Sequence, residues 1–296
     1  MSYRIILWSL FFPLAAVLLI VPALAARDVK IIVNMKPQDI RQGDAVLVRV
    51  SVDKKTTGIS GKWRERTLSF FRDKEENSFS TLMGIDLDEA PGEKTVRLRI
   101  TGSQGGVFNH PVTFLVLKKD FPVQRLTLPP GMVTLSPENL ARARRERSAV
   151  DRLWDASSNK KRWSEAFVMP IEGTVLSPFG VKRILNNKHR SPHSGIDLRA
   201  CAGAPVAATS GGTVMLAADH FFAGKSVYLD HGTGIVSMYF HLSKILVTEG
   251  EKVAGGQVIG LAGETGRASG PHLHWGVRIH GCRVDPLSLV KLFKVE

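Results

Sequence analysis

The chain has 296 residues and a formal net charge of +13, with 44% hydrophobic and 23% charged residues. This length exceeds what one hydrophobic core usually organises, so we expect two domains. The positive charge predicts an acidic partner. Nucleic acid is excluded from that role, because the sequence carries no recognisable nucleic-acid-binding module and its N-terminus is typical of an exported protein.

The first 25 residues have the pattern of a secretory signal peptide. A short basic start ends at Arg4, an apolar run covers residues 5–21, and residues 23–25 form a small-residue cleavage site. The alternative is a retained membrane anchor, because the run approaches the length of a spanning helix, although two prolines interrupt it. We expect a mature protein that begins at Ala26 and acts in the periplasm or outside the cell. Membrane contact is expected only if the segment is retained.

Residues 26–122 are expected to form an accessory domain of β-strands. Residues 45–52 and 95–100 alternate apolar and polar side chains, which is the period of a strand with one buried face. Further strands are expected at 29–35, 67–71, 79–87 and 112–117. Short strands at this spacing predict a small immunoglobulin-like β-sandwich. No cluster of catalytic residues falls within it. We therefore expect an accessory domain that positions the rest of the protein, binds a partner or occludes a site in the second domain.

Residues 123–167 are expected to form a short, basic, helical connector. Ser136 followed by Pro137 is typical of a helix N-cap and first helical position. Apolar residues then fall on one stripe and arginines on the opposite face, so the helix should pack on one domain with its basic face in solvent. The alternative is that this face contacts acidic wall polymer or a membrane surface. Trp163 is a candidate for stacking on sugar rings.

Residues 168–296 are expected to form a second domain, an antiparallel β-sheet with a groove. Short strands alternate with tight glycine turns, and almost no helical period is present. The expected strands span residues 173–177, 205–208, 212–217, 226–230, 235–240, 257–261 and 272–279. The fold class predicted for the whole chain is therefore all-β, with one helical connector between the domains.

Two histidine motifs in the second domain carry metal-binding chemistry. His193 and Asp197 stand four residues apart, and His272 and His274 flank Leu273 further along the chain. Because residues i and i+2 of a strand face the same side, both histidines should point together while Leu273 turns into the core. Imidazole and carboxylate ligands suit Zn²⁺, and a catalytic zinc takes three protein ligands. The pattern predicts a zinc hydrolase site.

Either motif alone is a weak signal, because a single histidine is most often a surface residue or a hydrogen-bonded core residue. Glycines surround both motifs, and a further histidine, His241, ends an apolar strand between them. His220 and His280 carry no catalytic argument. His231 begins a glycine-rich turn and is expected to be structural.

Residues 170–293 closely resemble the lysostaphin/LytM-type zinc endopeptidases, which cut peptide cross-links of bacterial peptidoglycan. The resemblance rests on an ordered series of motifs: SPFG at 177–180, HSGID at 193–197, GTV at 212–214, DHG at 230–232, YFHLS at 239–243, GRASGPHLH at 266–274 and VDP at 284–286. It implies a duplicated hybrid motif fold with loops around a groove. It also implies that His193, Asp197 and His274 bind one zinc ion, and that His241 and His272 are the catalytic pair.

The residue types support that division of roles. Zinc activates water and polarises a substrate carbonyl. The sequence lacks the His-Glu-x-x-His helix that supplies a glutamate base elsewhere, so histidines must orient the water, move its proton and hydrogen-bond the oxyanion. In some relatives an asparagine caps the metal in a latent form, a role open here to Asn186 or Asn187. His189 is either a solvated loop residue or a substrate contact.

The two cysteines, Cys201 and Cys282, both fall in the second domain. Such a pair in an oxidising compartment is a candidate disulfide. Each cysteine follows an expected strand that carries a metal ligand, so a bridge between them is plausible. Thiolate ligation of zinc is disfavoured, because three better-placed ligands already exist.

The sequence is compatible with three functions. The favoured one is a secreted zinc endopeptidase acting on peptidoglycan stem peptides, with the D-Ala–diaminopimelate bond preferred over glycine bridges because no wall-targeting repeat is visible. The second is a non-catalytic member that activates another wall hydrolase, although such members typically lack zinc ligands. The third is a periplasmic scaffold, which leaves the complete ligand set unexplained. A regulatory protein partner is left open.

Overall fold

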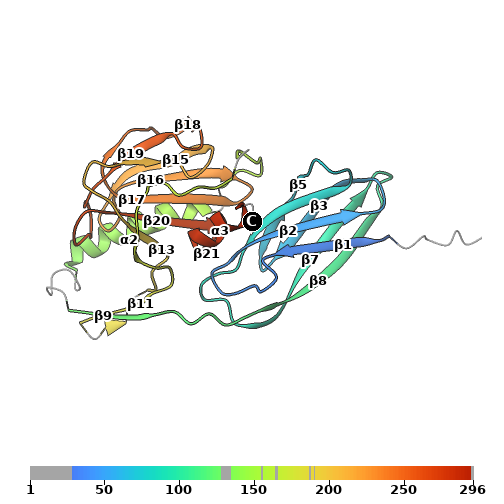
Figure 1. The fold of residues 1–296 in the computed structure, drawn as a ribbon, viewed down its shortest axis with the longest axis horizontal. Coiled ribbons are helices and arrows are strands. Elements are labelled where there is room, and N and C mark those ends of the chain that lie inside the picture. Colours follow the sequence, from blue (N-terminus) through green and yellow to red (C-terminus); the bar gives the residue numbers. More distant parts are fainter. Residues whose placement is uncertain are drawn as a thin grey trace, which may run out of the picture.

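The computed structural model describes residues 29–127, 135–154, 156–163, 166–186, 188–189 and 191–294. The predicted signal segment lies outside the described residues. Within them the chain is mostly β-strand and forms two bodies (Figure 1), with the strands of the N-terminal body at one end and those of the C-terminal body at the other. No helix in the described part of the chain combines the length and apolar character needed to cross a membrane.

Two antiparallel four-stranded sheets form the N-terminal body. Its strands are β1 (Ile31–Lys36), β2 (Ala45–Val52), β3 (Thr56–Trp63), β4 (Arg66–Ser69), β5 (Phe71–Arg72), β6 (Ser78–Gly84), β7 (Gly92–Gly102) and β8 (Val107–Val116). The sheet orders are β1-β2-β6-β5 and β4-β3-β7-β8. Both sheets contribute to a single core, which includes Val48 of β2, Met83 of β6 and Leu98 of β7.

The alternating pattern in the sequence explains most of these strands. Val46, Val48 and Val50 of β2 are completely buried, and Arg97 and Arg99 of β7 are exposed between buried neighbours, as a strand with one buried face requires. The pattern does not predict β3, because Gly58, Ser60 and Gly61 interrupt the alternation of apolar and polar side chains. Ile59 and Trp63 supply the buried surface of that strand.

A ten-stranded antiparallel assembly forms the C-terminal body. Its strands are β10 (Val175–Ser177), β13 (Gly195–Arg199), β14 (Pro205–Ala207), β15 (Gly212–His220), β16 (Gly224–Gly232), β17 (Ile235–Ile245), β18 (Lys252–Val253), β19 (Val258–Ala262), β20 (His272–Ile279) and β21 (Cys282–Val284). The main order is β10-β13-β20-β17-β16-β15-β18; β19 pairs with β14 and β17, and β21 pairs with β20. A short helix, α3 (Pro286–Leu292), follows β21 and packs against this sheet.

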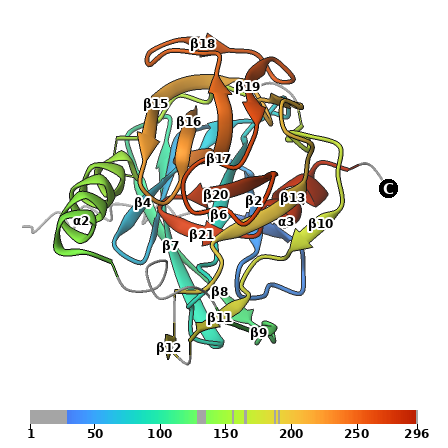
Figure 2. The same cartoon turned by 90° about the vertical axis from the view of Figure 1, so that its left-hand side faces the viewer.

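The predicted connector helix is present as α2 (Pro137–Asp151), followed by a 3₁₀ turn at Arg152–Trp154. The predicted N-cap is confirmed, because the Ser136 hydroxyl accepts a hydrogen bond from Asn139 N–H at 3.2 Å. Val150, Leu153 and Trp154 pack against the apolar face of β16 and β17, so the prediction of a helix packed on one domain is confirmed. Figure 2 shows α2 flanking the sheet beside β15 and β16.

A small third sheet links the two bodies. Strand β9 (Val123–Leu126) leaves the N-terminal body and pairs in parallel with β11 (Lys182–Leu185), which pairs with β12 (Lys188–His189). Phe121, just before β9, packs edge-on against Phe179, with ring centroids 6.2 Å apart. The exit from the N-terminal body is therefore fixed beside the segment that precedes the first predicted metal ligand.

The two bodies share packed and ionic contacts. Ala45 and Leu82 of the N-terminal body belong to the hydrophobic core of the C-terminal body. Arg283 of β21 donates to both carboxylate oxygens of Asp86, through its backbone N–H at 2.8 Å and its guanidinium at 2.5 Å. Asp285 N–H donates to the carbonyl oxygen of Gly43 at 2.7 Å. These contacts fix the bodies to each other along β21 and α3.

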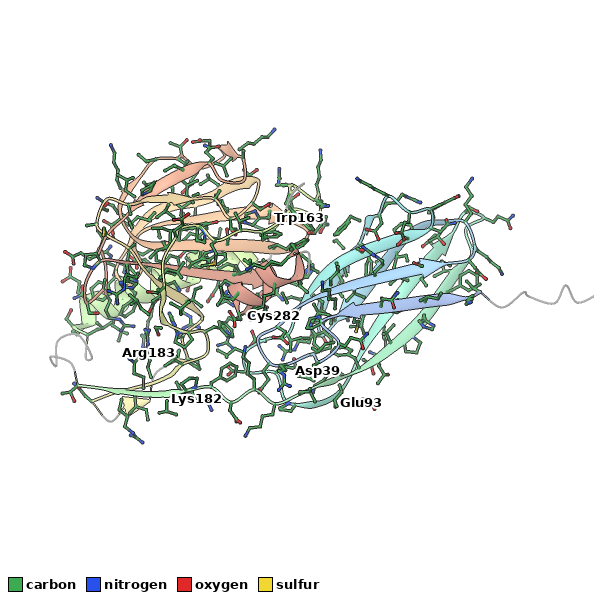
Figure 3. The ribbon with its side chains drawn as sticks, viewed as in Figure 1. Asp39, Glu93, Trp163, Lys182, Arg183 and Cys282 are labelled. Carbon is green, nitrogen blue, oxygen red and sulfur yellow. The ribbon has the colours of Figure 1, made fainter. Side chains whose placement is uncertain are left out.

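The structure does not support sugar stacking by Trp163. Its side chain is only 6% exposed and packs edge-on against Phe71 of the N-terminal body and Phe293 beyond α3. Figure 3 shows Trp163 at the junction of the two bodies. The basic residues around Trp163 predict an exposed side chain. Its indole is instead part of the hydrophobic core where the two bodies meet.

The two cysteines are free thiols. Cys201 is exposed in the turn after β13, whereas Cys282 is buried where β21 meets Gly84 of the N-terminal body. Burial raises the pKa of the Cys282 thiol to about 11, so this thiol stays protonated at neutral pH. The possible disulfide is absent, and Cys282 instead serves as a small apolar contact between the bodies.

Candidate metal centre

The three predicted ligands come together on two adjacent strands. Asp197 of β13 lies directly opposite His274 of β20 in the antiparallel register, and His193 lies two residues before β13 begins. Leu273 is completely buried in the core on the other face of β20, as the period-two pattern predicts. The strand pairing, rather than proximity in sequence, unites residues that are 81 positions apart.

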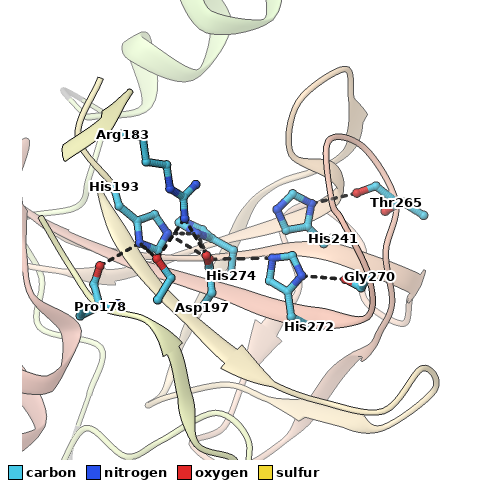
Figure 4. Close-up of polar contacts among 10 residues, drawn as sticks. Pro178, Arg183, His193, Asp197, His241, Thr265, Gly270, His272 and His274 are labelled. Carbon is cyan, nitrogen blue, oxygen red and sulfur yellow. Dashed lines mark hydrogen bonds and ion pairs between the residues drawn. The ribbon is translucent and has the colours of Figure 1, made fainter. Parts of the chain in front are cut away.

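The donor atoms of this triad form a closed triangle (Figure 4). Nε2 of His193 lies 2.9 Å from Oδ1 of Asp197 and 2.9 Å from Nδ1 of His274, and the last two atoms are also 2.9 Å apart. Two ring nitrogens that face each other need a proton or a cation between them. Two imidazole nitrogens and one carboxylate oxygen at mutual contact distance fit a single bound cation, and the set matches the donors that Zn²⁺ prefers.

Neighbouring groups hold each ligand in the orientation that a metal requires. Nδ1 of His193 donates to the carbonyl oxygen of Pro178 at 2.9 Å, which leaves the Nε2 lone pair facing the triad. The His274 ring stacks on Phe240, with centroids 5.1 Å apart and planes 11° from parallel. Burial lowers the pKa of His274, which favours the neutral form of its ring. A side chain at Gly195 would collide with the His274 ring and the Trp275 carbonyl.

The carboxylate of Asp197 is held from both sides. Burial favours its protonated form, but the His193 and His274 ring nitrogens beside Oδ1 keep its pKa well below the usual range for aspartate. Oδ2 accepts a hydrogen bond from the Arg183 guanidinium at 2.9 Å. Arg183 was not among the predicted site residues, because no motif distinguishes it from the other basic residues of the sequence.

The predicted catalytic pair lies beside the triad. The His241 and His272 rings have centroids 4.8 Å apart, and Nε2 of His272 lies 3.8 Å from Oδ1 of Asp197. Nδ1 of His241 donates to the carbonyl oxygen of Thr265, and Nδ1 of His272 to that of Gly270, each at 2.8 Å. In both rings the bond to the backbone therefore occupies Nδ1 and leaves Nε2 available to the site. Burial lowers the pKa of His241 to about 4.

The backbone around His241 is unusual. This residue has a φ of 62°, a left-handed conformation that is uncommon outside glycine and asparagine and that often marks functional sites. Its N–H donates to the carbonyl oxygen of Ala223 at 2.8 Å, so the β15–β16 turn helps to fix the ring. Gly266, at a φ of 73°, lets the loop after β19 approach the backbone of that turn, where a Cβ would collide.

Three other histidines whose side chains the structure describes, His220, His231 and His280, do not join the centre. His231 is fully buried, with its ring nitrogens 2.7 Å from the Gly211 carbonyl and from the Ser237 hydroxyl, as expected for a structural residue. His220 bonds the Ser226 hydroxyl at 2.9 Å, and His280 is buried near the junction of the bodies. Asn187 and the His189 side chain lie outside the described residues. Arg183, from the strand just before them, donates to the predicted ligand Asp197.

Comparisons with known proteins agree with this geometry. Residues 191–286 match the model of peptidase family M23. The crystal structure of a candidate M23 peptidase from Pseudomonas aeruginosa superimposes with a TM-score of 0.65 and 32% sequence identity, over 82% of this chain and 92% of that protein. The likeness therefore covers both bodies and not the C-terminal one alone.

Two curated relatives match the C-terminal region. The peptidoglycan DD-endopeptidase ShyA of Vibrio cholerae is 43% identical over 100 residues, which are 34% of this chain and 23% of that protein. The DD-carboxypeptidase/endopeptidase Mpg of Neisseria meningitidis is 40% identical over 117 residues, which are 39% of this chain and 26% of that protein. The match thus spans about a quarter of the length of these relatives.

Proposed function

This chain belongs to peptidase family M23, and from that premise we propose that it is a zinc metalloendopeptidase that hydrolyses peptide cross-links of bacterial peptidoglycan. The observation that carries the proposal is the closed triangle of His193, Asp197 and His274 donors with two free imidazole acceptors beside it. One curated relative is named a peptidoglycan DD-endopeptidase, and the other a DD-carboxypeptidase/endopeptidase. These names support the proposed substrate class. Among cross-links, we propose the D-Ala–diaminopimelate bond.

In this proposal His193, Asp197 and His274 hold one zinc ion. A bound zinc ion supplies Lewis acidity, which polarises the scissile carbonyl and makes water a stronger acid. Since Nδ1–H of both His241 and His272 is committed to a backbone carbonyl, each ring meets the substrate with an Nε2 acceptor. The two rings therefore begin the reaction as hydrogen-bond acceptors for the attacking water.

The two helper histidines have different environments, which assigns them different steps. Burial holds the pKa of His241 at about 4, so placing a proton there is costly and this ring orients the water. His272, whose Nε2 faces Asp197 at 3.8 Å, takes the proton. Once protonated, its Nε2–H donates to the developing oxyanion and then returns the proton to the leaving amine.

The complete ligand and helper set disfavours the alternative that this chain only activates another cell-wall hydrolase. A direct test combines two measurements on the purified full chain. The metal content of protein reconstituted with zinc should be one ion per chain, and this holoprotein should cleave a purified cross-linked muropeptide dimer. A chain that binds one zinc ion but leaves the dimer intact would support the activator role instead.

The remaining assignments follow from the sequence and the fold. We propose four parts: a signal peptide (1–25), an immunoglobulin-like sandwich (26–122), a helical connector (123–167) and the peptidase domain (168–296). The two-sheet core of the N-terminal body supports the second assignment. A peptidoglycan substrate places the enzyme in the periplasm or outside the cell. A regulatory partner is compatible with this arrangement.

A further inference from the structure

Arg183 of β11 contacts the side of the metal centre that faces away from the three donor atoms. Its Nη2 donates to Oδ2 of Asp197 at 2.9 Å and to the Ser177 hydroxyl at 3.0 Å. The other carboxylate oxygen, Oδ1, is the one that meets the His193 and His274 nitrogens. The two oxygens of the Asp197 carboxylate thus have different partners: Oδ1 faces the donor nitrogens, and Oδ2 accepts from the guanidinium (Figure 4).

The same guanidinium is linked to a second ligand. The Ser177 hydroxyl that accepts from Arg183 lies 3.3 Å from Nδ1 of His193, the nitrogen that also bonds the Pro178 carbonyl. Ser177 pairs with Asp197 in the register of β10 and β13. One guanidinium nitrogen, Nη2, therefore donates to Asp197 directly and is linked to His193 through the Ser177 hydroxyl, so it connects the outer sides of two of the three ligands.

The position of Arg183 is set by its neighbours in sequence and in space. Lys182 N–H donates to the Pro122 carbonyl oxygen at 2.8 Å, which ties β11 to the start of β9. On the other side, His193 N–H donates to the Val181 carbonyl at 2.9 Å, and Gly180 N–H donates to the His193 carbonyl at 2.8 Å. The backbone that carries Arg183 is thus bonded directly to the backbone that carries His193.

We propose that Arg183 is a positioning residue for the metal centre, which holds Asp197 with one oxygen directed at the metal and restrains His193 through Ser177. The inference rests on the proposed function, because it assumes that the triad binds zinc. Groups that hydrogen-bond metal ligands typically change metal affinity about 10- to 100-fold when they are removed. An ion pair of merely structural value, by contrast, would leave zinc affinity and ligand geometry unchanged.

The test measures zinc affinity of the full chain by competition with a chromogenic chelator, for wild type, Arg183→Leu, Arg183→Lys and Ser177→Ala. Lys182→Gln is the matched control, since it removes a neighbouring cation from the same strand. We expect about 10- to 100-fold weaker zinc binding in Arg183→Leu. Smaller losses are expected in Arg183→Lys, which keeps the charge on a shorter side chain, and in Ser177→Ala. Lys182→Gln should stay within twofold of wild type.

Visible absorption of the cobalt-substituted proteins adds a readout of ligand geometry. The d–d bands should differ between wild type and Arg183→Leu, and should coincide for wild type and Lys182→Gln. Wild-type affinity and an unchanged cobalt spectrum in Arg183→Leu would overturn the proposal, as would an equal loss in Lys182→Gln. If Arg183→Leu does not fold, wild-type affinity in both Arg183→Lys and Ser177→Ala would overturn it. A wild-type chain that binds no zinc would overturn the proposed function as well.

Discussion

Each imidazole at the metal centre uses its two nitrogens for different purposes. In His193, His241 and His272 the Nδ1–H group donates to a backbone carbonyl and Nε2 faces the site. His274 reverses the pattern, with Nδ1 toward Asp197 and its ring stacked on Phe240. Because backbone carbonyls orient the first three rings and Phe240 orients the fourth, these rings are ready to bind a cation or accept a proton without rearrangement.

The first prediction separates ligands from helpers. His193→Ala and His274→Ala should lose zinc binding and all activity, because each leaves two donors. His272→Ala should keep one zinc ion per chain but lose about 10²- to 10⁴-fold in kcat, the usual contribution of a general base. Zinc content and hydrolysis of a cross-linked dimer, measured on the same samples, check both. Zinc-free His272→Ala protein would contradict the division of roles.

The second prediction concerns acid stability away from the centre. Burial lowers the pKa of both His231 and His280 to about 4, below the value of about 6.5 expected in the unfolded chain. Between these limits the unfolded chain binds protons that the folded chain does not, so stability falls as the pH falls from 6.5 to 4. Each of these histidines changes the free energy of unfolding by at most about 1.4 kcal/mol per pH unit.

Urea unfolding of the metal-free protein at pH 7, 5.5 and 4.5 measures this slope. His280→Gln removes one of the titrating groups and should reduce the dependence of unfolding free energy on pH. A His280→Gln variant with the same slope as wild type would show that this ring is not held neutral by its burial.

The motifs predict the five central residues but not the groups that orient them. His193, Asp197, His241, His272 and His274 stand in spacings that imply ligand chemistry, and the structure brings all five together. Arg183 and the carbonyls of Pro178, Thr265 and Gly270 act through tertiary contacts. A carbonyl is common to every residue, so a sequence gives no sign of which one accepts a bond.

At the scale of elements, α2 supports the turn that positions His241. Glu146 accepts a hydrogen bond from Phe221 N–H at 2.8 Å and a second from Arg142 at 2.7 Å, while Arg142 also donates to the Asp219 carbonyl at 3.1 Å. This turn between β15 and β16 holds Ala223, whose carbonyl oxygen bonds His241 N–H. The helix thus acts on the site through a single turn.

The third prediction follows from that contact. Glu146→Ala should lower kcat by up to about tenfold with zinc content unchanged, because misplacement of a catalytic group by a full ångström costs about 100-fold. Glu138→Ala, in the exposed first turn of the same helix, is the control and should retain wild-type kcat. Steady-state hydrolysis of the dimer measures both. Equal kcat in the two variants would contradict a role for α2 at the site.

Elements with a clear hydrophobic period were predictable, and short or glycine-rich ones were not. The alternation in β2 and β7 and the N-cap of α2 are visible in the sequence and present in the structure. The seven-residue helix α3 is too short to show a period, although Asp285 caps it and Leu289 is buried beneath it. The pairing of β9 with β11 joins segments almost 60 residues apart, which no local pattern reports.

At the scale of the whole molecule, the two bodies form one connected structure. Asp86 of the N-terminal body is 8% exposed, and Arg283 supplies donors to both of its oxygens. These hydrogen bonds keep the pKa of Asp86 below its usual range although burial acts in the opposite direction. The sequence predicts two domains but not this interface, because its partners stand 197 positions apart.

The fourth prediction tests the interface. Arg283→Ala leaves the Asp86 carboxylate short of donors and should lower the free energy of unfolding by about 1–3 kcal/mol. Lys118→Ala removes an ion pair with Asp120 that is exposed on both sides, and should cause no measurable change. Urea unfolding at pH 7 compares the two. Equal stability of both variants would contradict a structural role for the Arg283 contact.

We propose that this chain cleaves peptide cross-links of peptidoglycan with a zinc centre built from His193, Asp197 and His274. The most direct measurement is mass analysis of the soluble fragments released when the purified protein digests isolated peptidoglycan, beside a chelator-treated sample and His272→Ala. We predict monomeric stem peptides derived from cross-linked dimers, cut between D-Ala and diaminopimelate, and absent from both controls. Intact dimers despite bound zinc, or release that survives the chelator, would contradict the account.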